Sequence, residues 1–409
     1  MNTNESPKYA VLIGDGMADL PIPSLGGKTP LEYASTPHMD RIAREGILGM
    51  ARTVPEGMPA GSDVANLSIF GYDPRFAYTG RAPLEALNMG IELGANDVAI
   101  RCNMVEVRGG EMIDFSADHI ESPFSEIIMR ELASSIPAPD VEFHAGVSYR
   151  NIIVWRHYPH RDLPETTPPH DIQGQQVAPF LPKGPGADRL IEIMEASVRI
   201  IDSSPRIREA ATRHRGRPTS VWLWGCGRKP AIEPLSKRFG FEGHTIAAVD
   251  LVHGLGRAAG LTPLPVPGVT GYLDTNYRGK TEALIQSIAR CGIVFLHVEA
   301  PDESGHEGNL DHKIQAIEDF DRLVVGPVLE GLAPYPAFTL LVMPDHPTPI
   351  SLRTHTAEPV PFAMYSSRGW NTPLFAGKRG GAFSEAAARN TGLFVEGHRL
   401  IDVMVNRAI

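Results

Sequence analysis

The chain has 409 residues, 42% hydrophobic and 21% charged, and a formal net charge of −10. This length predicts roughly two or three domains, and the composition is that of a folded globular protein, which excludes a disordered or fibrous chain. The negative charge and the scattered Lys and Arg residues argue against nucleic acid as a partner.

The sequence also argues against a membrane or secreted protein. It has no run of about 18 uncharged apolar residues, and its start lacks the basic segment and cleavage site of a signal peptide. Its cysteines, Cys102, Cys226 and Cys291, are too few and too far apart for a disulfide framework or a CxxC metal site. We therefore expect reduced, buried thiols in a cytoplasmic protein with no membrane partner.

The first hundred residues predict alternating strands and helices. Residues 9–14 form an apolar run that closes on Gly-Asp-Gly, typical of a buried parallel strand ending in a tight turn. Pro at the start and Gly at the end delimit a helix over residues 37–46. Residues 62–70 predict a second helix and residues 98–107 a second strand.

The character of the chain changes between residues 112 and 215. This part is richer in Pro and His and has weaker strand signals, so we expect a smaller inserted domain there. Residues 1–111 and 216–409 would form the core. Apolar runs resume after Pro218 and alternate with helices, which predicts an α/β fold with a parallel or mixed sheet. The runs are VWLWG, HTIAAVDLV, IVFLHVEA and FTLLVMPDH.

Acidic residues and histidines follow several of these runs. Asp15 follows the apolar run at residues 10–13, Asp302 follows IVFLHVEA, and the pair Asp345-His346 follows FTLLVMP. A Gly-rich turn is expected after HTIAAVDLV. In open α/β sheets, ligands bind beyond the carboxyl ends of the strands. Polar groups there are costly unless they are paired or coordinated, so we expect these side chains to converge.

The spacing of these groups predicts a metal centre. Asp302 and His306 are four residues apart and would share one face of a helix, and His355 lies nine residues beyond His346. Such donors suffice for two divalent ions and suit Zn, Mn, Fe or Co better than Ca. Two ions about 3.5–4 Å apart can polarise a phosphoryl oxygen and activate a nucleophile.

Ser62 is the candidate nucleophile. Gly61 before it permits close approach, and the following helix would direct backbone N–H groups at an anion. A serine oxygen on a metal ion loses its proton easily. The alternative is that Ser62 is simply a helix N-cap.

Basic side chains are candidates for holding an anionic substrate. Arg81 and Lys280 follow turn signals, and Arg150 and His170 belong to the middle domain. Arg offers a planar fork to phosphate or carboxylate, whereas Lys offers a point charge. Each could instead be an ordinary surface residue. Residues 254–260 read G-x-G-x-x-x-G, not the G-x-G-x-x-G of dinucleotide-binding folds, which argues against a nicotinamide enzyme.

Taken together, these motifs resemble the alkaline phosphatase superfamily, and within it the archaeal-type cofactor-independent phosphoglycerate mutases. The resemblance covers nearly the whole chain and includes GDGMAD, PAGSDVANLSIFGYDP, YTGRAPLEA, EAPDESGHEGN and DHPTPISLRTHTAEPVP. It implies an α/β, alkaline-phosphatase-like core with a mostly parallel sheet sandwiched by helices. It also implies a smaller inserted α+β domain that caps the substrate.

The resemblance implies a set of site residues and two divalent ions, Mn²⁺ first with Zn²⁺, Co²⁺ or Mg²⁺ as alternatives, and no need for 2,3-bisphosphoglycerate. One ion would be surrounded by Asp15, Ser62, Asp345 and His346, and the other by Asp302, His306 and His355. The substrate would be lined by Arg81, Asn103, Arg150, His170, Asp171 and Lys280.

The implied activity is the interconversion of 3-phosphoglycerate and 2-phosphoglycerate through a phosphoserine at Ser62, a step of glycolysis and gluconeogenesis. Arg81 and Lys280 would stabilise the transferring phosphoryl group, and His170 or Asp171 would act as base for the 2-hydroxyl. Closure of the smaller domain would exclude water.

One segment departs from the family pattern. Residues 343–349 read MPDHPTP, where the mutases read TGDHSTP around the Asp-His pair. A related subgroup proposed to make phosphohomoserine in threonine biosynthesis is similar here, so a homoserine phosphotransferase is the alternative function. A phosphatase or sulfatase, and a binding protein with an inactive site, are further alternatives.

Overall fold

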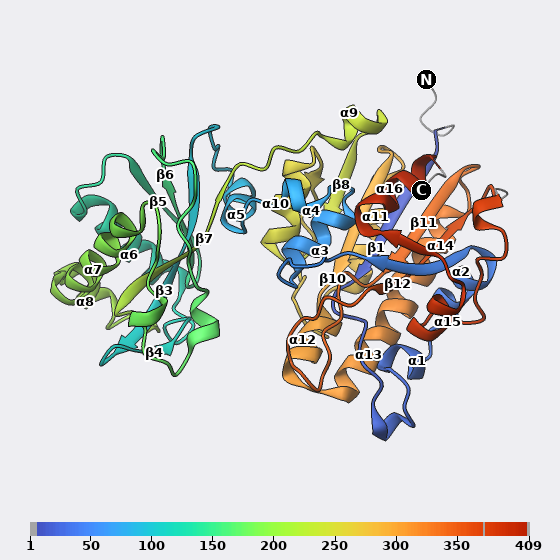
Figure 1. The fold of residues 1–409 in the computed structure, drawn as a ribbon, viewed down its shortest axis with the longest axis horizontal. Coiled ribbons are helices and arrows are strands. Elements are labelled where there is room, and N and C mark those ends of the chain that lie inside the picture. The colour runs from blue at the N-terminus through green and yellow to red at the C-terminus, as the bar shows by residue number, and fades with distance from the viewer. Residues whose placement is uncertain (1–5, 371–372, 407–409) are drawn as a thin grey trace. The chain divides into compact units, whose positions relative to one another are not determined.

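The computed structural model describes residues 6–370 and 373–406 (Figure 1). The chain divides into two compact units. The first takes the chain up to Tyr78 and from Ile232 onward, and the second takes Thr79–Ala231. Among the described residues, none of the helices combines the length and the apolarity that a membrane span requires.

The second unit extends beyond the insertion expected at residues 112–215 on both sides. The reason is strand pairing: β3 (Val98–Arg108) lies antiparallel to β7 (Ser220–Arg228), with Cys102 opposite Leu223. Each strand is recognisable as an apolar run, but the sequence does not reveal which strand it pairs with. The boundaries expected at 112 and 215 therefore fall inside this unit.

The first unit is built on one eight-stranded sheet. Only β12 runs antiparallel to its neighbours, and the other strands are parallel to one another. The mainly parallel α/β core expected from the sequence is thereby confirmed. In spatial order the strands are β13 (Phe394–Glu396), β2 (Ile47–Arg52), β12 (Val360–Ser366), β11 (Phe338–Met343), β1 (Lys8–Gly14), β10 (Ile293–Val298), β8 (Gly243–Ile246) and β9 (Thr262–Pro263).

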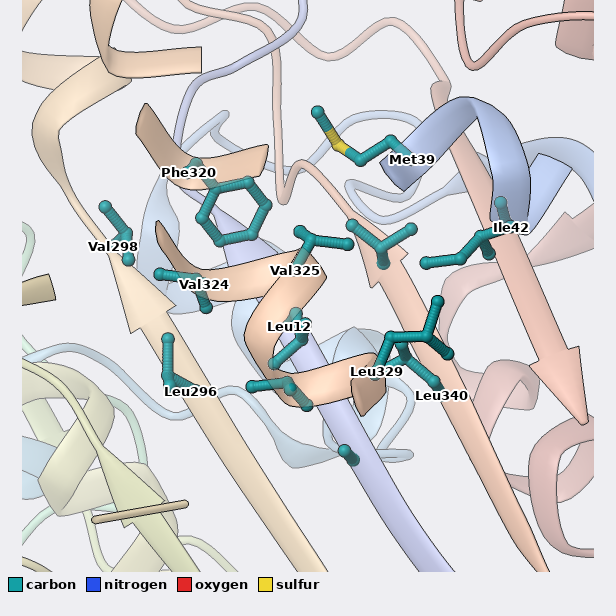
Figure 2. Close-up of a cluster of buried hydrophobic side chains, with 14 of the residues drawn as sticks. Leu12, Met39, Ile42, Leu296, Val298, Phe320, Val324, Val325, Leu329 and Leu340 are labelled. Carbon is teal, nitrogen blue, oxygen red and sulfur yellow. The ribbon is translucent and has the colours of Figure 1, made fainter. Parts of the chain in front are cut away.

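Helices cover both faces of this sheet, which explains why its central strands are continuous apolar runs. On one face, Leu12, Leu296 and Leu340 from three neighbouring strands meet side chains of the helical segment that carries Phe320 and Leu329 (Figure 2). On the other face Phe70 stacks on Phe295 with ring centroids 4.0 Å apart. The core thus holds the central strands rigidly, and with them the polar residues at their ends.

The helices of the first unit connect these strands. The predicted helix over residues 37–46 is confirmed: it ends at Gly46, whose N–H bonds the Ile42 carbonyl. The helices are α1 (Pro30–Tyr33), α2 (Pro37–Glu45), α3 (Ser62–Ile69), α4 (Pro74–Ala77), α9 (Leu235–Phe239), α10 (Asp250–Ala258), α11 (Tyr277–Ile288), α12 (Ala300–Glu307), α13 (Leu310–Phe320), the π-turn η4 (Asp321–Val325), α14 (Gly326–Leu332), α15 (Glu385–Asn390) and α16 (Leu400–Asn406).

The strand expected over HTIAAVDLV is confirmed only in its first part, and the helix expected after it, up to Gly260, is confirmed, whereas the Gly-rich turn is wrong. The strand β8 stops at Ile246, and residues from Asp250 onward are the helix α10, which includes Gly254 and Gly256. A Cβ at Gly256 would lie 2.5 Å from Thr245 Cγ2. The glycine therefore serves close packing of a helix on its strand, not a turn.

The second unit has an antiparallel sheet with helices packed against it, the α+β arrangement expected. Its strands are β4 (Glu111–Asp114), β3, β6 (Arg150–Trp155), β5 (Val141–Val147) and β7. Its α-helices are α5 (Ala82–Asn88), α6 (Ser122–Ser135), α7 (Ala187–Ser203) and α8 (Pro205–Ala210). Buried residues of β3, β7, α6 and α7 form its core.

Candidate active site

The carboxyl ends of three adjacent strands carry the candidate site. Gly14 of β1 lies opposite Val298 of β10, and Ile13 lies opposite Met343 of β11. Parallel strands that end in register bring the next residues together. Asp15 directly follows β1, Asp345 lies two residues beyond β11, and the helix α12 that follows β10 begins with Ala300.

Three residues expected around one ion lie together. His346 Nε2 is 3.4 Å from Asp15 Oδ1 and 3.5 Å from Asp345 Oδ2. All three side chains are buried. Burial and the neighbouring Asp345 carboxylate raise the pKa of Asp15 well above its ordinary value. Burial works the same way on Asp345, but the imidazoles of His346 and His297 outweigh it and lower the pKa of that carboxyl.

Ser62 belongs to this group. Its Oγ lies 3.1 Å from His346 Nε2. Ser62 is the first residue of α3, and the residue before it, Gly61, occupies the N-cap position. The N-cap alternative is therefore wrong, and the hydroxyl faces the candidate ligands instead.

The remaining three expected ligands form a second group. His306 Nε2 lies 3.3 Å from Asp302 Oδ2 and 2.9 Å from His355 Nε2, and His355 Nε2 lies 3.4 Å from Asp302 Oδ1. Asp302 and His306 are one turn apart on α12, as their spacing predicts for a helix. The hydrogen bond to Asp302 raises the pKa of His306 to about 9.

The two groups are not separate in space. Donor atoms of Asp302, His346 and His355 all lie within 4.8 Å of one another, as do those of Asp15, Asp345 and His346. His346 therefore belongs to both sets, whereas the resemblance placed it in one. The sequence could not show this, because the reach of an imidazole between two strand ends depends on the fold.

Polar neighbours hold these side chains in place. Asn66 donates to Asp345 Oδ2 at 2.8 Å and the Gly16 N–H donates to Asp345 Oδ1 at 3.1 Å. The Thr348 hydroxyl bonds both Asp302 and His346. Gly16 has a φ of +60°, and a Cβ there would lie 2.6 Å from Asp302 Oδ1. No larger residue would leave room for this carboxylate.

The donor set fits divalent cations. Three buried carboxylates lie close together, and Asp15 Oδ1 accepts no hydrogen bond from any described residue. Buried carboxylates that lie close together repel each other unless positive charge lies between them. Carboxylate and imidazole donors together suit Mn²⁺, Zn²⁺ or Co²⁺.

Lys280 lies elsewhere than expected. Its side chain is completely buried, and its ammonium donates 2.8 Å hydrogen bonds to Glu299 Oε2 and to the His297 carbonyl. In this arrangement it does not face a substrate. Because both acceptors lie at the end of β10, the Lys280 ammonium holds this strand end in place. We therefore correct the assignment of Lys280 from a substrate contact to a structural residue.

His297 and Glu299 are site residues that the sequence analysis missed. His297 is the fifth residue of β10 and is fully buried. Its Nδ1 lies 3.2 Å from Glu299 Oε1 and its Nε2 lies 3.5 Å from Asp15 Oδ2. Burial opposes its charge, but Asp345 and Glu299 raise the pKa of His297 to about 9. A histidine inside the apolar run IVFLHVEA was the signal that could have revealed it.

The second unit contains a cluster of arginines around one carboxylate. Glu85 accepts a 2.9 Å hydrogen bond from Arg81 Nε, and its other carboxylate oxygen forms an ion pair with Arg101, whose Nε lies 3.1 Å away. Burial works against ionisation of Glu85, but Arg101, Arg81 and Arg150 together lower its pKa. Burial in turn lowers the pKa of Arg101 to about 10. Arg101, which was not assigned to the site, also stacks on Trp224, with its guanidinium carbon 4.2 Å from the ring centroid.

The other expected substrate residues of this unit differ in exposure. Asn103 is buried, accepts from Trp224 Nε1 at 3.1 Å and donates to the Phe115 carbonyl, so its amide is used within the fold. His170 lies edge-on to Trp224 and 3.7 Å from Asp171, and both of these polar side chains are about half exposed. Of these three side chains, only those of His170 and Asp171 are open to a ligand.

Comparison with known proteins identifies relatives of full length. Residues 43–206 match the family model described as 2,3-bisphosphoglycerate-independent phosphoglycerate mutase. A probable 2,3-bisphosphoglycerate-independent phosphoglycerate mutase of Geobacter sulfurreducens is 49% identical over 98% of this chain and 100% of its own length. The enzyme of that name from Methanosarcina barkeri is 44% identical over 97% of this chain and 99% of its own.

Solved structures share the fold. A protein of Pyrococcus horikoshii is 28% identical, with a TM-score of 0.79 over 99% of both chains. The cofactor-independent phosphoglycerate mutase of Thermoplasma acidophilum is 22% identical, with a TM-score of 0.66 over 98% of this chain and 100% of its own. From its near-full-length relatives, the chain belongs to the 2,3-bisphosphoglycerate-independent phosphoglycerate mutase family.

Proposed function

We propose that this chain interconverts 3-phosphoglycerate and 2-phosphoglycerate by phosphoryl transfer through Ser62. The observation that carries this proposal is the position of Ser62: its Oγ lies 3.1 Å from His346, at the start of the eight-residue helix α3 and beside buried carboxylates. Relatives that match nearly the whole chain carry the name of this activity. That name favours phosphoglycerate over homoserine as the substrate.

Two groups of side chains would hold two divalent cations. Asp15, Asp345 and His346 would hold one, and Asp302, His306 and His355 the other. When bound, such cations supply positive charge that lowers the pKa of a serine hydroxyl and neutralises phosphoryl oxygens. Mn²⁺ is the expected ion because both carboxylates and imidazoles are offered.

The chain's own residues define the first half of the reaction. The Ser62 oxygen attacks phosphorus, the bond between phosphorus and the C3 oxygen breaks, and the hydroxyl proton of Ser62 passes to the departing glycerate oxygen. The phosphoryl group then sits on Ser62 at the N-terminus of α3, where the helix dipole favours an anion. Asn66 and Gly16 keep Asp345 in place throughout.

In the second half, the 2-hydroxyl of glycerate attacks the phosphoserine, the bond from phosphorus to the Ser62 oxygen breaks, and the serine recovers a proton. His170 or Asp171 is our candidate base for that hydroxyl, as predicted from the sequence; both side chains are accessible, and they lie 3.7 Å apart within the second unit. Arg81, Arg101 and Arg150 outnumber the single carboxylate of Glu85. This surplus of guanidinium charge suits a carboxylate or phosphate group of the substrate.

The direct test is an assay of the purified chain with 3-phosphoglycerate alone, in which the formation of 2-phosphoglycerate is measured. A second assay measures phosphohomoserine formed from homoserine plus ATP, and a third measures free phosphate released from 3-phosphoglycerate. We expect 2-phosphoglycerate to form and Ser62→Ala to abolish its formation while the fold is kept. Ser203→Ala, which changes an exposed serine on α7, serves as the matched control and stays active. Normal turnover by Ser62→Ala would refute the phosphoserine, and phosphohomoserine formation without mutase activity would refute the substrate.

A further inference from the structure

A buried imidazole faces the first group of candidate ligands without being needed for the steps above. His297 lies in β10 opposite Ile13, two residues before the Asp15 carboxylate along the neighbouring strand. It is fully buried, and its Nε2 makes no hydrogen bond with any described residue. The same Nε2 lies 3.5 Å from Asp15 Oδ2 and 4.0 Å from Asp345 Oδ2. A buried polar atom without a partner needs an explanation.

The opposite side of the ring is held firmly. Glu299 Oε1 lies 3.2 Å from His297 Nδ1 and also accepts the Ala248 N–H at 2.8 Å, while Glu299 Oε2 accepts from Lys280 at 2.8 Å. A carboxylate paired with a buried ammonium is an acceptor only, so His297 Nδ1 must carry the proton and donate it. In the neutral ring, the lone pair of Nε2 then points toward Asp15 and Asp345.

The distances distinguish two uses of that nitrogen. A protonated imidazole donating to a carboxylate would approach to about 2.7–2.9 Å, closer than either carboxylate lies. Two donors that bind one cation at about 2.1 Å lie about 3.4 Å apart in tetrahedral geometry. The separations of 3.5 Å from His297 to Asp15 and 3.4 Å from His346 to Asp15 match the second case, and the 4.0 Å from His297 to Asp345 is longer.

We propose that His297 is a further ligand of the cation that Asp15, Asp345 and His346 hold, and that Glu299 and Lys280 are its positioning pair. A ligand histidine whose other ring nitrogen donates to a carboxylate is the usual arrangement at protein metal sites. A second imidazole at this position favours Mn²⁺, Zn²⁺ or Co²⁺ over Mg²⁺, which prefers oxygen donors. This inference rests on the two-cation site of the proposed function.

The test measures metal binding directly. The full chain is freed of metal with a chelator and titrated with Co²⁺ by calorimetry, and the visible absorption of bound Co²⁺ is recorded. We expect His297→Ala and His297→Asn to weaken one of two binding events by at least about 10–100-fold and to change the spectrum. Glu299→Gln should weaken the same event less. His312→Ala, at a half-exposed histidine, is the matched control and leaves both events unchanged.

Different failures have different meanings. Wild-type affinity and spectrum in folded His297→Ala would overturn the ligand role while leaving the proposed function intact. Absence of Co²⁺ binding by the unaltered chain would overturn the two-cation site itself. If neither His297 variant folds, hyperfine spectra of the Mn²⁺-loaded wild-type chain count coordinated imidazoles: four support the proposal and three overturn it.

Discussion

The two units of this chain bury opposite kinds of charge. In the first unit, three carboxylates and several imidazoles gather at the ends of parallel strands, with few donors to satisfy them. In the second, Arg81, Arg101 and Arg150 gather around Glu85 on and beside an antiparallel sheet. An excess of buried acceptors suits cations, and an excess of guanidinium groups suits anions. The difference indicates that metal binding and anion recognition are carried by separate elements.

Of the changes considered, removal of metal should have the largest effect on turnover. Treatment with a chelator is expected to abolish turnover, and added Mn²⁺ should restore it, because the first unit's carboxylates need bound cations to act together. Activity is measured with 3-phosphoglycerate before and after chelation. Full activity in a preparation shown to be free of metal would contradict the metal centre.

Substitutions of ligands come next. Asp302→Ala or His306→Ala should lower the metal content below two ions per chain, because each removes a donor from the second group. The metal content is measured by elemental analysis of the purified chain. Arg150→Ala in the other unit is the contrast: it should keep both ions and raise KM about tenfold. Two ions retained in both ligand variants would show that these residues are not ligands.

The buried ion pair of the second unit gives a smaller, thermodynamic effect. Arg101 and Glu85 are both nearly inaccessible, so Arg101→Met leaves Glu85 without its most buried partner. We expect a loss of about 3–5 kcal/mol in the free energy of unfolding of this unit. The double variant with Glu85→Gln should recover part of that loss. Denaturant unfolding measures both, and an unchanged midpoint for Arg101→Met would contradict the assignment.

The smallest effect is that of pH on the same pair. The pKa of Glu85 is lower in the folded chain than in the unfolded chain, since Arg101 and Arg81 outweigh the opposing effect of burial. The charged carboxylate therefore stabilises the fold above its unfolded pKa, and this contribution is lost as the pH falls through the folded value. Glu85→Gln should show a shallower loss of stability on acidification than the wild type. Parallel curves would contradict this.

Local patterns determined most of the elements. Residues 9–14, 293–298 and 338–343 are strands because continuous apolar runs can be buried on both faces of a sheet, and the helix over 37–46 has its start and stop in Pro and Gly. The acidic residues after these strands indicated where chemistry would gather, because strand ends of a parallel sheet share one edge.

The tertiary structure decided what depends on contacts between distant residues. It paired β3 with β7 and so widened the second unit, packed Gly256 of α10 closely on Thr245, and buried Lys280 against Glu299. It also placed His346 between both ligand groups and brought His297 to Asp15. Sequence spacing reports the neighbours of a residue along one element, whereas these contacts join residues up to hundreds of positions apart through the order of strands in a sheet.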